Sequence, residues 1–296
     1  MTWLLLGLLW LLHWLPYPLQ AALGRGLGSL LWRLARRRRA IALRNLELCF
    51  PQWSLARREQ VGREHFGWVA RALLERAFLW WASPRRLQHV LHLRGAVDEA
   101  LHGEGPVLLL GLHFEGMDAA WTALTLAAHR PLSGMYTPQK SAPLDRWVLA
   151  GRSRFATERI VSRHEGATGM LRALRRRTPF YTLPDMDFGP KHARFIPFFG
   201  VPAATLDVVP RLAASTGARI HPVVARMLPG SQGYEVTIHP AWTDYPTLRD
   251  GRLADIDSDL LRLNRFIEQQ VESMPSQYHW VHKRFKTRPP GEPPLY

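Results

Sequence analysis

Short apolar runs alternate with amphipathic helical stretches over most of this chain, and this alternation restricts it to few folds. Strands are expected at 106–112, 131–136, 158–162, 179–184, 218–226 and 234–240. Helices are expected at 118–128, 145–151, 166–177, 205–216 and 253–273. Strands that alternate with helices form a mostly parallel sheet whose two faces the helices cover. The predicted fold class is therefore α/β, with a mostly parallel central sheet covered by helices on both faces.

One longer helix precedes this region, at 54–82. Its apolar residues recur at spacings of three and four, and Ser54 is a suitable N-cap. The opposite face is basic and carries Arg57, Arg58, Arg63, Arg71 and Arg76. We expect that face to lie in solvent or against anionic headgroups.

The chain is strongly basic and rich in arginine. Its 296 residues include 39 Lys and Arg against 24 Asp and Glu, a formal net charge of +15, and only four of the basic residues are Lys. Guanidinium groups suit phosphates and carboxylates, which indicates anionic partners such as lipid headgroups, acidic proteins or nucleic acid. An apolar content of 47% excludes a disordered chain. The single cysteine, Cys49, excludes an internal disulfide and a cysteine-based zinc site, which fits a reducing compartment.

The N-terminal segment is apolar and free of charge up to residue 24. Its apolar run at 3–15 is shorter than the roughly 20 residues of a spanning helix, and Pro16 and Pro18 interrupt it. A signal peptide would carry positive charge before the run, whereas here the arginines at 36–39 follow it. A buried core helix is a second alternative, but a membrane-anchoring helical segment better explains tryptophans beside an arginine cluster. We expect an anchor with its basic juxtamembrane segment at 1–50 and a catalytic domain at 51–296, and a full span or a Pro-broken hairpin both fit.

The segment with the clearest chemistry follows the strand at 106–112. His113 and Asp118 lie five positions apart around a glycine-containing turn, where α/β proteins place their sites. If His113 lies in the turn and Asp118 in the first turn of the next helix, the carboxylate can hydrogen-bond the imidazole and raise its basicity. Glu115 is an alternative partner for His113. The pattern predicts a base that takes a proton from an alcohol.

Three further clusters follow along the chain. Basic side chains that suit an oxyanion or a phosphate are Arg152, Arg154, Arg163, Lys191 and Arg194. Asp185 and Asp187 follow the strand at 179–184 and are expected at the rim of a pocket. Near the C-terminus, Arg284 lies in a segment that alternates aromatic and basic residues, which favours packing near a phosphate site.

Taken together, these motifs resemble a known family. The blocks HFEGMD, GRSRF, LPDMDFGPK and HWVHKRFKTRPPG, in this order, are similar to those of the late (secondary) acyltransferases of bacterial lipid A biosynthesis, the lauroyl and myristoyl transferases. That family lies within the glycerolipid acyltransferase superfamily. The resemblance covers nearly the whole chain, and the second pair of blocks is more specific than the His113–Asp118 spacing. Some members carry Glu at the position of Asp118, so the shorter Asp here changes the reach of the carboxylate.

The resemblance implies an activity, partners and a location. It implies an O-acyltransferase that moves a fatty acyl chain from acyl carrier protein to a hydroxyl of a lipid A precursor, with no metal and no diffusible cofactor. It also implies the cytoplasmic face of the inner membrane, and nucleic acid is not an expected partner. In the mechanism that we expect, His113 deprotonates the hydroxyl and Asp118 stabilises the imidazolium. Arg152 or backbone amides would then stabilise the oxyanion.

Alternatives of other classes stay open at this point. An acyltransferase of the same superfamily could act on another glycolipid or a phospholipid. A metal-dependent phosphohydrolase could use His113, Asp118, Asp185, Asp187 and His192. A non-enzymatic protein that binds membrane surfaces would also be basic and apolar at one end. The acyl chain length, the acceptor hydroxyl and the oligomeric state are not encoded in these motifs.

Overall fold

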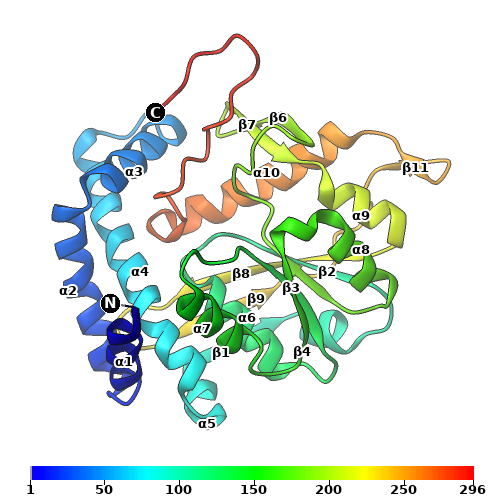
Figure 1. Ribbon diagram of the computed structural model, residues 1–296. Coiled ribbons are helices and arrows are strands. Elements are labelled where there is room, and N and C mark those ends of the chain that lie inside the picture. The colour runs from blue at the N-terminus through cyan, green and yellow to red at the C-terminus, as the bar shows by residue number, and fades with distance from the viewer. Residues whose placement is uncertain (1) are drawn as a thin grey trace.

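A seven-stranded sheet forms the centre of the computed structural model, which describes residues 2–296 (Figure 1). Its strand order is β1-β9-β8-β2-β5-β3-β4. The strands are β1 (Leu91–Gly95), β2 (Val107–Gly111), β3 (Leu132–Tyr136), β4 (Thr157–Ser162), β5 (Phe180–Thr182), β8 (Arg219–Met227) and β9 (Tyr234–Ile238). The five strands from β8 to β4 are parallel, whereas β9 is antiparallel to β8 and parallel to β1. The α/β class with a mostly parallel sheet is confirmed.

Helices cover both faces of this sheet. They are α1 (Thr2–Leu12), α2 (Tyr17–Leu34), α3 (Arg36–Cys49), α4 (Leu55–Trp81), α5 (Pro84–Gln88), α6 (Met117–Ala127), α7 (Ala142–Arg152), α8 (Gly166–Arg175), α9 (Val208–Thr216) and α10 (Ile256–Ser273). The apolar side chains of α6, α7 and the end of α4 pack on one face, and those of α8, α9 and α10 pack on the other.

Strand β2 shows why the sheet needs both layers. All five of its residues are buried. Leu108 and Leu110 belong to the core that includes α8, α9 and α10, whereas Val107 and Leu109 belong to the core under α6. Successive side chains of a strand point to opposite faces, so a continuous apolar run requires cover on both.

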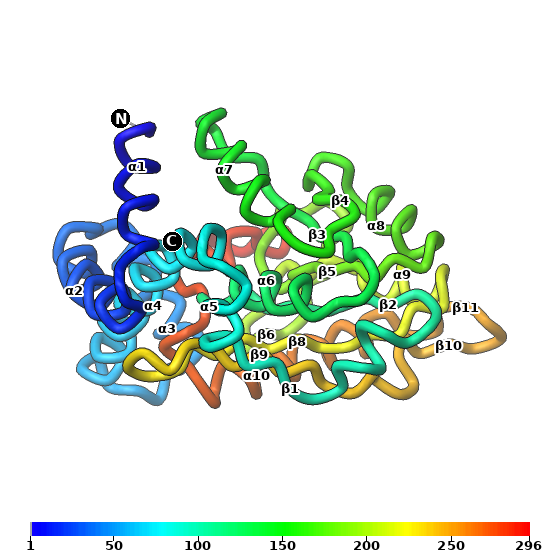
Figure 2. The backbone as a smooth tube through the Cα atoms, turned by 90° about the horizontal axis from the view of Figure 1, so that it is seen from below, coloured from blue at the N-terminus to red at the C-terminus, as the bar shows by residue number. Residues whose placement is uncertain are grey.

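The N-terminal helices form a separate layer beside the sheet, at the left of Figure 1. Helix α1 projects from the body next to α7 (Figure 2), and Leu6 and Leu9 of α1 pack against α4 and α7. Pro16 and Pro18 separate α1 from α2, as expected. No helix among residues 2–296 combines the length and the apolarity needed to cross a membrane.

Helices α2 and α4 touch backbone to backbone. A Cβ atom on Gly28 would lie 2.5 Å from the Cα atom of Gly67, so this crossing admits only glycine at position 28 without a shift. Ser54 caps α4 by accepting a hydrogen bond from the backbone amide of Arg57 at 3.2 Å. The predicted start of this long helix is confirmed.

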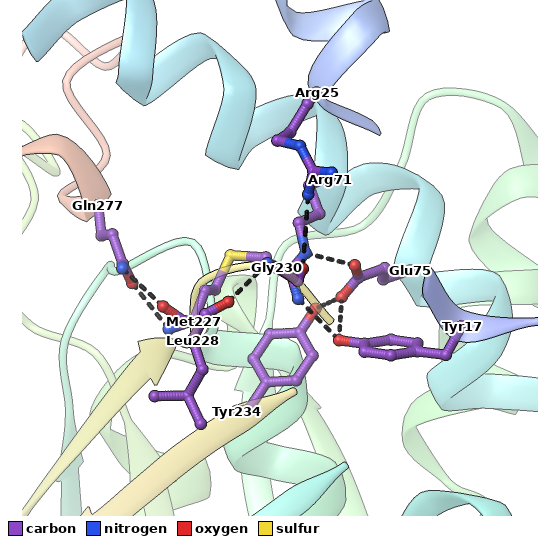
Figure 3. Close-up of polar contacts among 9 residues, drawn as sticks. All are labelled: Tyr17, Arg25, Arg71, Glu75, Met227, Leu228, Gly230, Tyr234 and Gln277. Carbon is purple, nitrogen blue, oxygen red and sulfur yellow. Dashed lines mark hydrogen bonds and ion pairs between the residues drawn. The ribbon is translucent and has the colours of Figure 1, made fainter. Parts of the chain in front are cut away.

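A buried polar network joins these helices to the sheet (Figure 3). The Arg71 Nε and Glu75 Oε1 atoms of α4 are 2.5 Å apart, and the Tyr17 hydroxyl of α2 donates to Glu75 Oε2 at 2.8 Å. The Tyr234 hydroxyl of β9 donates to the same carboxylate oxygen, and Arg71 Nη1 donates to the carbonyl of Leu228 at 2.8 Å. Arg71 was expected on a solvated face of α4, and that expectation is wrong because its charge is matched inside the protein.

Two regions differ from the expected element pattern. Residues at the start of the expected helix 205–216 belong instead to an antiparallel hairpin of β6 (Ala193–Phe198) and β7 (Val201–Leu206), and the helix begins at Val208. The helix expected from residue 253 begins at Ile256, after the two-residue strands β10 (Leu248–Arg249) and β11 (Arg252–Leu253). Strands β6 and β7 were missed because each is only half-buried and makes no continuous apolar run.

Candidate active site

Two neighbouring strands carry the central pair of side chains. His113 follows β2 after Gly111, and Asp185 follows β5 after Thr182. Leu110 of β2 pairs in parallel with Thr182 of β5, so both loops leave the sheet at the same edge. This is the edge at which open α/β sheets place their ligand sites.

The Asp185 carboxylate holds both the backbone and the ring of His113. Asp185 Oδ2 accepts the backbone amide of His113 at 2.8 Å, and Asp185 Oδ1 lies 2.6 Å from His113 Nδ1. The Asp185 side chain is fully buried, whereas the His113 side chain is 20% exposed. The imidazole is therefore fixed by a rigid partner while part of the ring stays accessible.

This contact determines which ring nitrogen of His113 can act as a base. Burial opposes ionisation of Asp185, but the charge of His113 and the hydrogen bonds from its ring and amide outweigh burial and lower the pKa of Asp185. An ionised carboxylate only accepts hydrogen bonds, so Nδ1 must be the protonated nitrogen of the ring. Nε2 then carries the lone pair, and it makes no hydrogen bond to the described residues 2–296.

Asp118 does not bind His113, so the expected hydrogen bond between them is wrong. Asp118 Oδ1 accepts Arg152 Nε at 2.9 Å and Arg152 Nη2 at 2.7 Å, and Asp118 Oδ2 accepts Arg76 Nε at 2.6 Å. The first turn of α6 directs Asp118 toward α4, which carries Arg76, and toward the end of α7, which carries Arg152. The two guanidinium groups therefore occupy the carboxylate that the local spacing assigned to the imidazole.

The Asp118 cluster leaves donors unused. Burial raises the pKa of Asp118, but Arg152 and Arg76 together lower it to about 2. Both arginine side chains are partly exposed. Among the hydrogen bonds of residues 2–296, Arg76 uses only its Nε and Arg152 uses its Nε and Nη2. The remaining N–H groups are free to bind an anion.

Glu115, the alternative partner for His113, binds a different histidine. Glu115 Oε1 lies 2.8 Å from His279 Nδ1. A short antiparallel bridge between Phe114 and Tyr278 brings the C-terminal segment to this loop. The site therefore contains a second imidazole–carboxylate pair beside the first.

Comparison with known proteins decides the family. The family model described as bacterial lipid A biosynthesis acyltransferase matches residues 1–287. The chain belongs to this family. It is 34% identical to the lipid A biosynthesis lauroyltransferase of Escherichia coli (strain K12) over 300 residues, which cover 100% of this chain and 94% of the relative. It is 32% identical to the palmitoleoyltransferase of the same strain, with 100% and 94% covered, and 30% identical to its myristoyltransferase, with 93% and 82% covered.

Membership identifies the chain as an acyltransferase of lipid A biosynthesis, and the two other classes considered above are set aside. The residues of the alternative phosphohydrolase also do not converge. Asp118 binds arginines, Asp187 binds the C-terminal segment, and His192 is exposed on a turn. No group of three or more metal-ligating side chains placed to hold an ion occurs between Thr2 and Tyr296.

The expected anion-binding residues of this acyltransferase fall into different places. Arg152 is part of the Asp118 cluster, whereas the Arg154 guanidinium donates to the carbonyls of Leu79 and Ala82 at the end of α4. Arg194 pairs with Asp257 at 2.7 Å. The exposed residues beyond the strand ends are Arg163, directly after β4, and Lys191, in the loop after β5.

Asp187 and Arg284 hold the C-terminal segment in place. Asp187 accepts the Thr287 backbone amide at 2.6 Å and the Thr287 hydroxyl at 2.8 Å. Arg284 is fully buried, donates to the carbonyl of Ala204 at 3.1 Å and lies over the ring of Phe198. Both were expected at a pocket, but their contacts are structural.

Two residues of the site were not among the predicted site residues. Arg76 was assigned to the solvated face of α4, and only the tertiary contact with Asp118 reveals its place. His279 was noted in the aromatic and basic C-terminal cluster without a partner. A signal for His279 exists in its position beside Tyr278 and Trp280, whose burial leaves the intervening side chain on the opposite side.

Proposed function

We propose that this acyltransferase moves a fatty acyl chain from acyl carrier protein to a hydroxyl of a lipid A precursor at the cytoplasmic face of the inner membrane. The observation that carries the proposal is the His113–Asp185 pair, in which Nδ1 is 2.6 Å from a buried carboxylate oxygen and Nε2 is unoccupied. An imidazole held in this way is the usual general base for an alcohol nucleophile.

In the proposed reaction His113 activates the acceptor. Nε2 takes the hydroxyl proton as the oxygen attacks the thioester carbonyl, the C–O bond forms and the C–S bond breaks. Asp185 keeps the ring in the required tautomer and stabilises the imidazolium. Base catalysis of this kind contributes about 10²–10⁴-fold.

The arginines on Asp118 are the proposed anion donors. Arg76 and Arg152 present free N–H groups from a pair of helices that Asp118 fixes in place. Donors that are oriented before the reaction stabilise an oxyanion by roughly 3–4 kcal/mol each. We assign to Asp118 the orientation of these arginines, and to Arg163 and Lys191 the binding of phosphates on the acceptor or on the pantetheine arm.

The N-terminal layer is the proposed membrane contact. Leu4 of α1 is 80% exposed, Trp3 is 67% exposed and Trp14, just after the helix, is 63% exposed. Large apolar side chains that gather on one exposed element are typical of a membrane or protein contact. The arginines at 36–39 open α3 and supply positive charge for an anionic leaflet.

A transfer assay tests the proposal. The purified protein is incubated with labelled acyl-acyl carrier proteins of several chain lengths and with lipid A precursors or a phospholipid as acceptor. We expect the wild type to acylate the lipid A precursor. His113→Ala should reduce the rate at least about 10²-fold because the base is lost.

The control for this variant is His89→Ala, which removes an exposed histidine outside the site and should retain the wild-type rate. Transfer by His113→Ala at more than a tenth of the wild-type rate would reject His113 as the base. Transfer to the phospholipid alone would reject the proposed acceptor.

A further inference from the structure

A second imidazole–carboxylate pair lies beside the proposed base. His279 Nδ1 is 2.8 Å from Glu115 Oε1, and the ring centroids of His279 and His113 are 6.5 Å apart. The Glu115 side chain is buried, whereas the His279 side chain is 28% exposed. This arrangement repeats that of His113 and Asp185, in which a buried carboxylate holds Nδ1 of a partly exposed ring.

The backbone fixes the position of one pair relative to the other. The amide of His279 donates to the carbonyl of His113 at 2.9 Å, and the amide of Glu115 donates to the carbonyl of Gln277 at 3.0 Å. These bonds flank the bridge between Phe114 and Tyr278, both of which are fully buried. The two rings therefore cannot move apart without breaking the junction between the β2 loop and the C-terminal segment.

The charges around His279 favour its protonated form. Burial raises the pKa of Glu115, but the charge and hydrogen bond of His279, followed by His65 and Arg76, lower it overall. Glu115 is therefore ionised at neutral pH, and a buried carboxylate at 2.8 Å stabilises an imidazolium.

The other histidines nearby do not compete for this role. Burial lowers the pKa of His65 to about 4, although Glu115 raises it and its ring contacts the Ser276 carbonyl. Burial together with His279 and His113 lowers the pKa of His282 to about 4 as well. Both rings are neutral at pH 7, so His113 and His279 are the two imidazoles of this group that a carboxylate supports.

Transfer from a thioester needs two proton transfers. The acceptor hydroxyl loses a proton when its oxygen attacks, and the sulfur gains one when the C–S bond breaks. An alkyl thiol has a pKa near about 8.5, so protonation of the departing sulfur lowers the barrier to its departure. A single base would have to complete the first transfer before it could start the second.

We infer that His279 is the general acid of this reaction and His113 is the general base. This inference rests on the proposed thioester donor. His113 Nε2 receives the hydroxyl proton, the C–O bond forms, and His279 Nε2–H gives its proton to the leaving sulfur as the C–S bond breaks, which yields the ester and the free thiol. The two rings then exchange one proton through solvent, and the site returns to its starting state.

The test compares two donors that carry the same acyl chain but different leaving thiols. One is an alkyl thioester of pantetheine, and the other is an aromatic thioester whose more acidic thiol leaves without a proton. His279→Gln should reduce kcat for the alkyl donor by about 10²–10³-fold and for the aromatic donor by less than about tenfold. His113→Ala should reduce kcat for both donors equally, because both need the base.

Two further variants make the result decisive. Glu115→Gln leaves the His279 ring in place and should show the same donor dependence in weaker form. His282→Gln removes a neutral histidine of the same segment and should leave the ratio of the two donor rates unchanged. Unfolding midpoints of all variants show whether each one is folded, and Glu115→Gln replaces His279→Gln if the latter is not.

Each outcome has a distinct meaning. Equal losses with both donors, or no loss with the alkyl donor, would overturn the role of His279 and leave the proposed function intact. A wild-type protein that accepts no thioester would overturn the proposed function and the role of His279 with it.

Discussion

At the scale of single residues, carboxylates determine what the site can do. The carboxylate nearest to His113 in the sequence pattern binds arginines, and a carboxylate 72 positions away binds the imidazole. Both aspartates are buried and ionised, but they act on different partners. Asp185 affects the base itself, whereas Asp118 affects the position of Arg76 and Arg152.

Substitution of the two aspartates should separate these roles. Asp185→Asn no longer stabilises the protonated Nδ1 tautomer, so we expect kcat to fall by about 10²–10⁴-fold with a small change in KM. Asp118→Asn loosens the arginines that bind an anionic substrate, so we expect KM to rise. Steady-state kinetics of both variants measure the split, and the reverse pattern would contradict this assignment.

The stability contribution of Asp118 should depend on pH. Its pKa falls from 3.8 to about 2 in the folded protein, so its contribution is complete above pH 4 and is lost as the pH falls through 2. The shift corresponds to about 2 kcal/mol. We expect Asp118→Asn to unfold more easily than the wild type by about this amount at pH 7 and to approach it near pH 2. A difference in urea unfolding that does not change with pH would contradict the ion pairs.

At the scale of elements, the junction of α2, α4 and β9 connects the N-terminal layer to the sheet. Glu75 accepts hydrogen bonds from Tyr17 and Tyr234 and pairs with Arg71, all in the protein interior. A buried ion pair of this kind adds little by itself, but loss of one partner leaves a buried charge unmatched. The network therefore makes the attachment of α2 sensitive to a single side chain.

Glu75→Gln tests this junction. The variant leaves Arg71 buried without a counter-charge, so we expect a loss of about 3–5 kcal/mol in the free energy of unfolding. Glu59→Gln on the same helix breaks only the exposed pair with Arg63 and should cost less than about 1 kcal/mol. Denaturant titration measures both, and equal costs would show that the network is not a junction.

The sequence predicted the elements whose apolar pattern is continuous and missed those whose pattern is interrupted. Strand β2 and helix α4 lie where periodicity places them, because burial of both strand faces or of one helix stripe leaves a strong pattern. The hairpin of β6 and β7 was missed because its residues alternate irregularly between buried and exposed. The partners of His113 and Asp118 could not be predicted, since Arg76 and Asp185 reach the site only through tertiary packing.

At the scale of the whole molecule, the exposed apolar residues gather at one end. Helix α1 projects from the body in Figure 2, and its outer face carries Leu4, Leu8 and Leu11, each at least half exposed. The same helix buries Leu6 and Leu9 against α4 and α7, so it is attached to the body and not a free tail. A projecting apolar surface on a protein with a net charge of +15 is suited to an anionic membrane.

Vesicle binding tests this surface. Leu4→Gln with Leu8→Gln removes two exposed side chains of α1, and we expect binding to phosphatidylglycerol vesicles to weaken by roughly 100-fold, because each leucine contributes about 1.5 kcal/mol or more when it leaves water. Leu55→Gln is the control, since Leu55 is 65% exposed on a different helix and should not affect binding. Unchanged sedimentation of the double variant with vesicles would contradict a membrane contact through α1.

The central claim is that Asp185, and not Asp118, sets the tautomer of the His113 base. Nitrogen NMR of protein labelled at histidine reports this directly, with the His113 signal assigned from His113→Gln. We predict a protonated Nδ1 and an unprotonated Nε2 in the wild type and in Asp118→Asn, and loss of this tautomer in Asp185→Asn. A tautomer that survives in Asp185→Asn but is lost in Asp118→Asn would contradict the account.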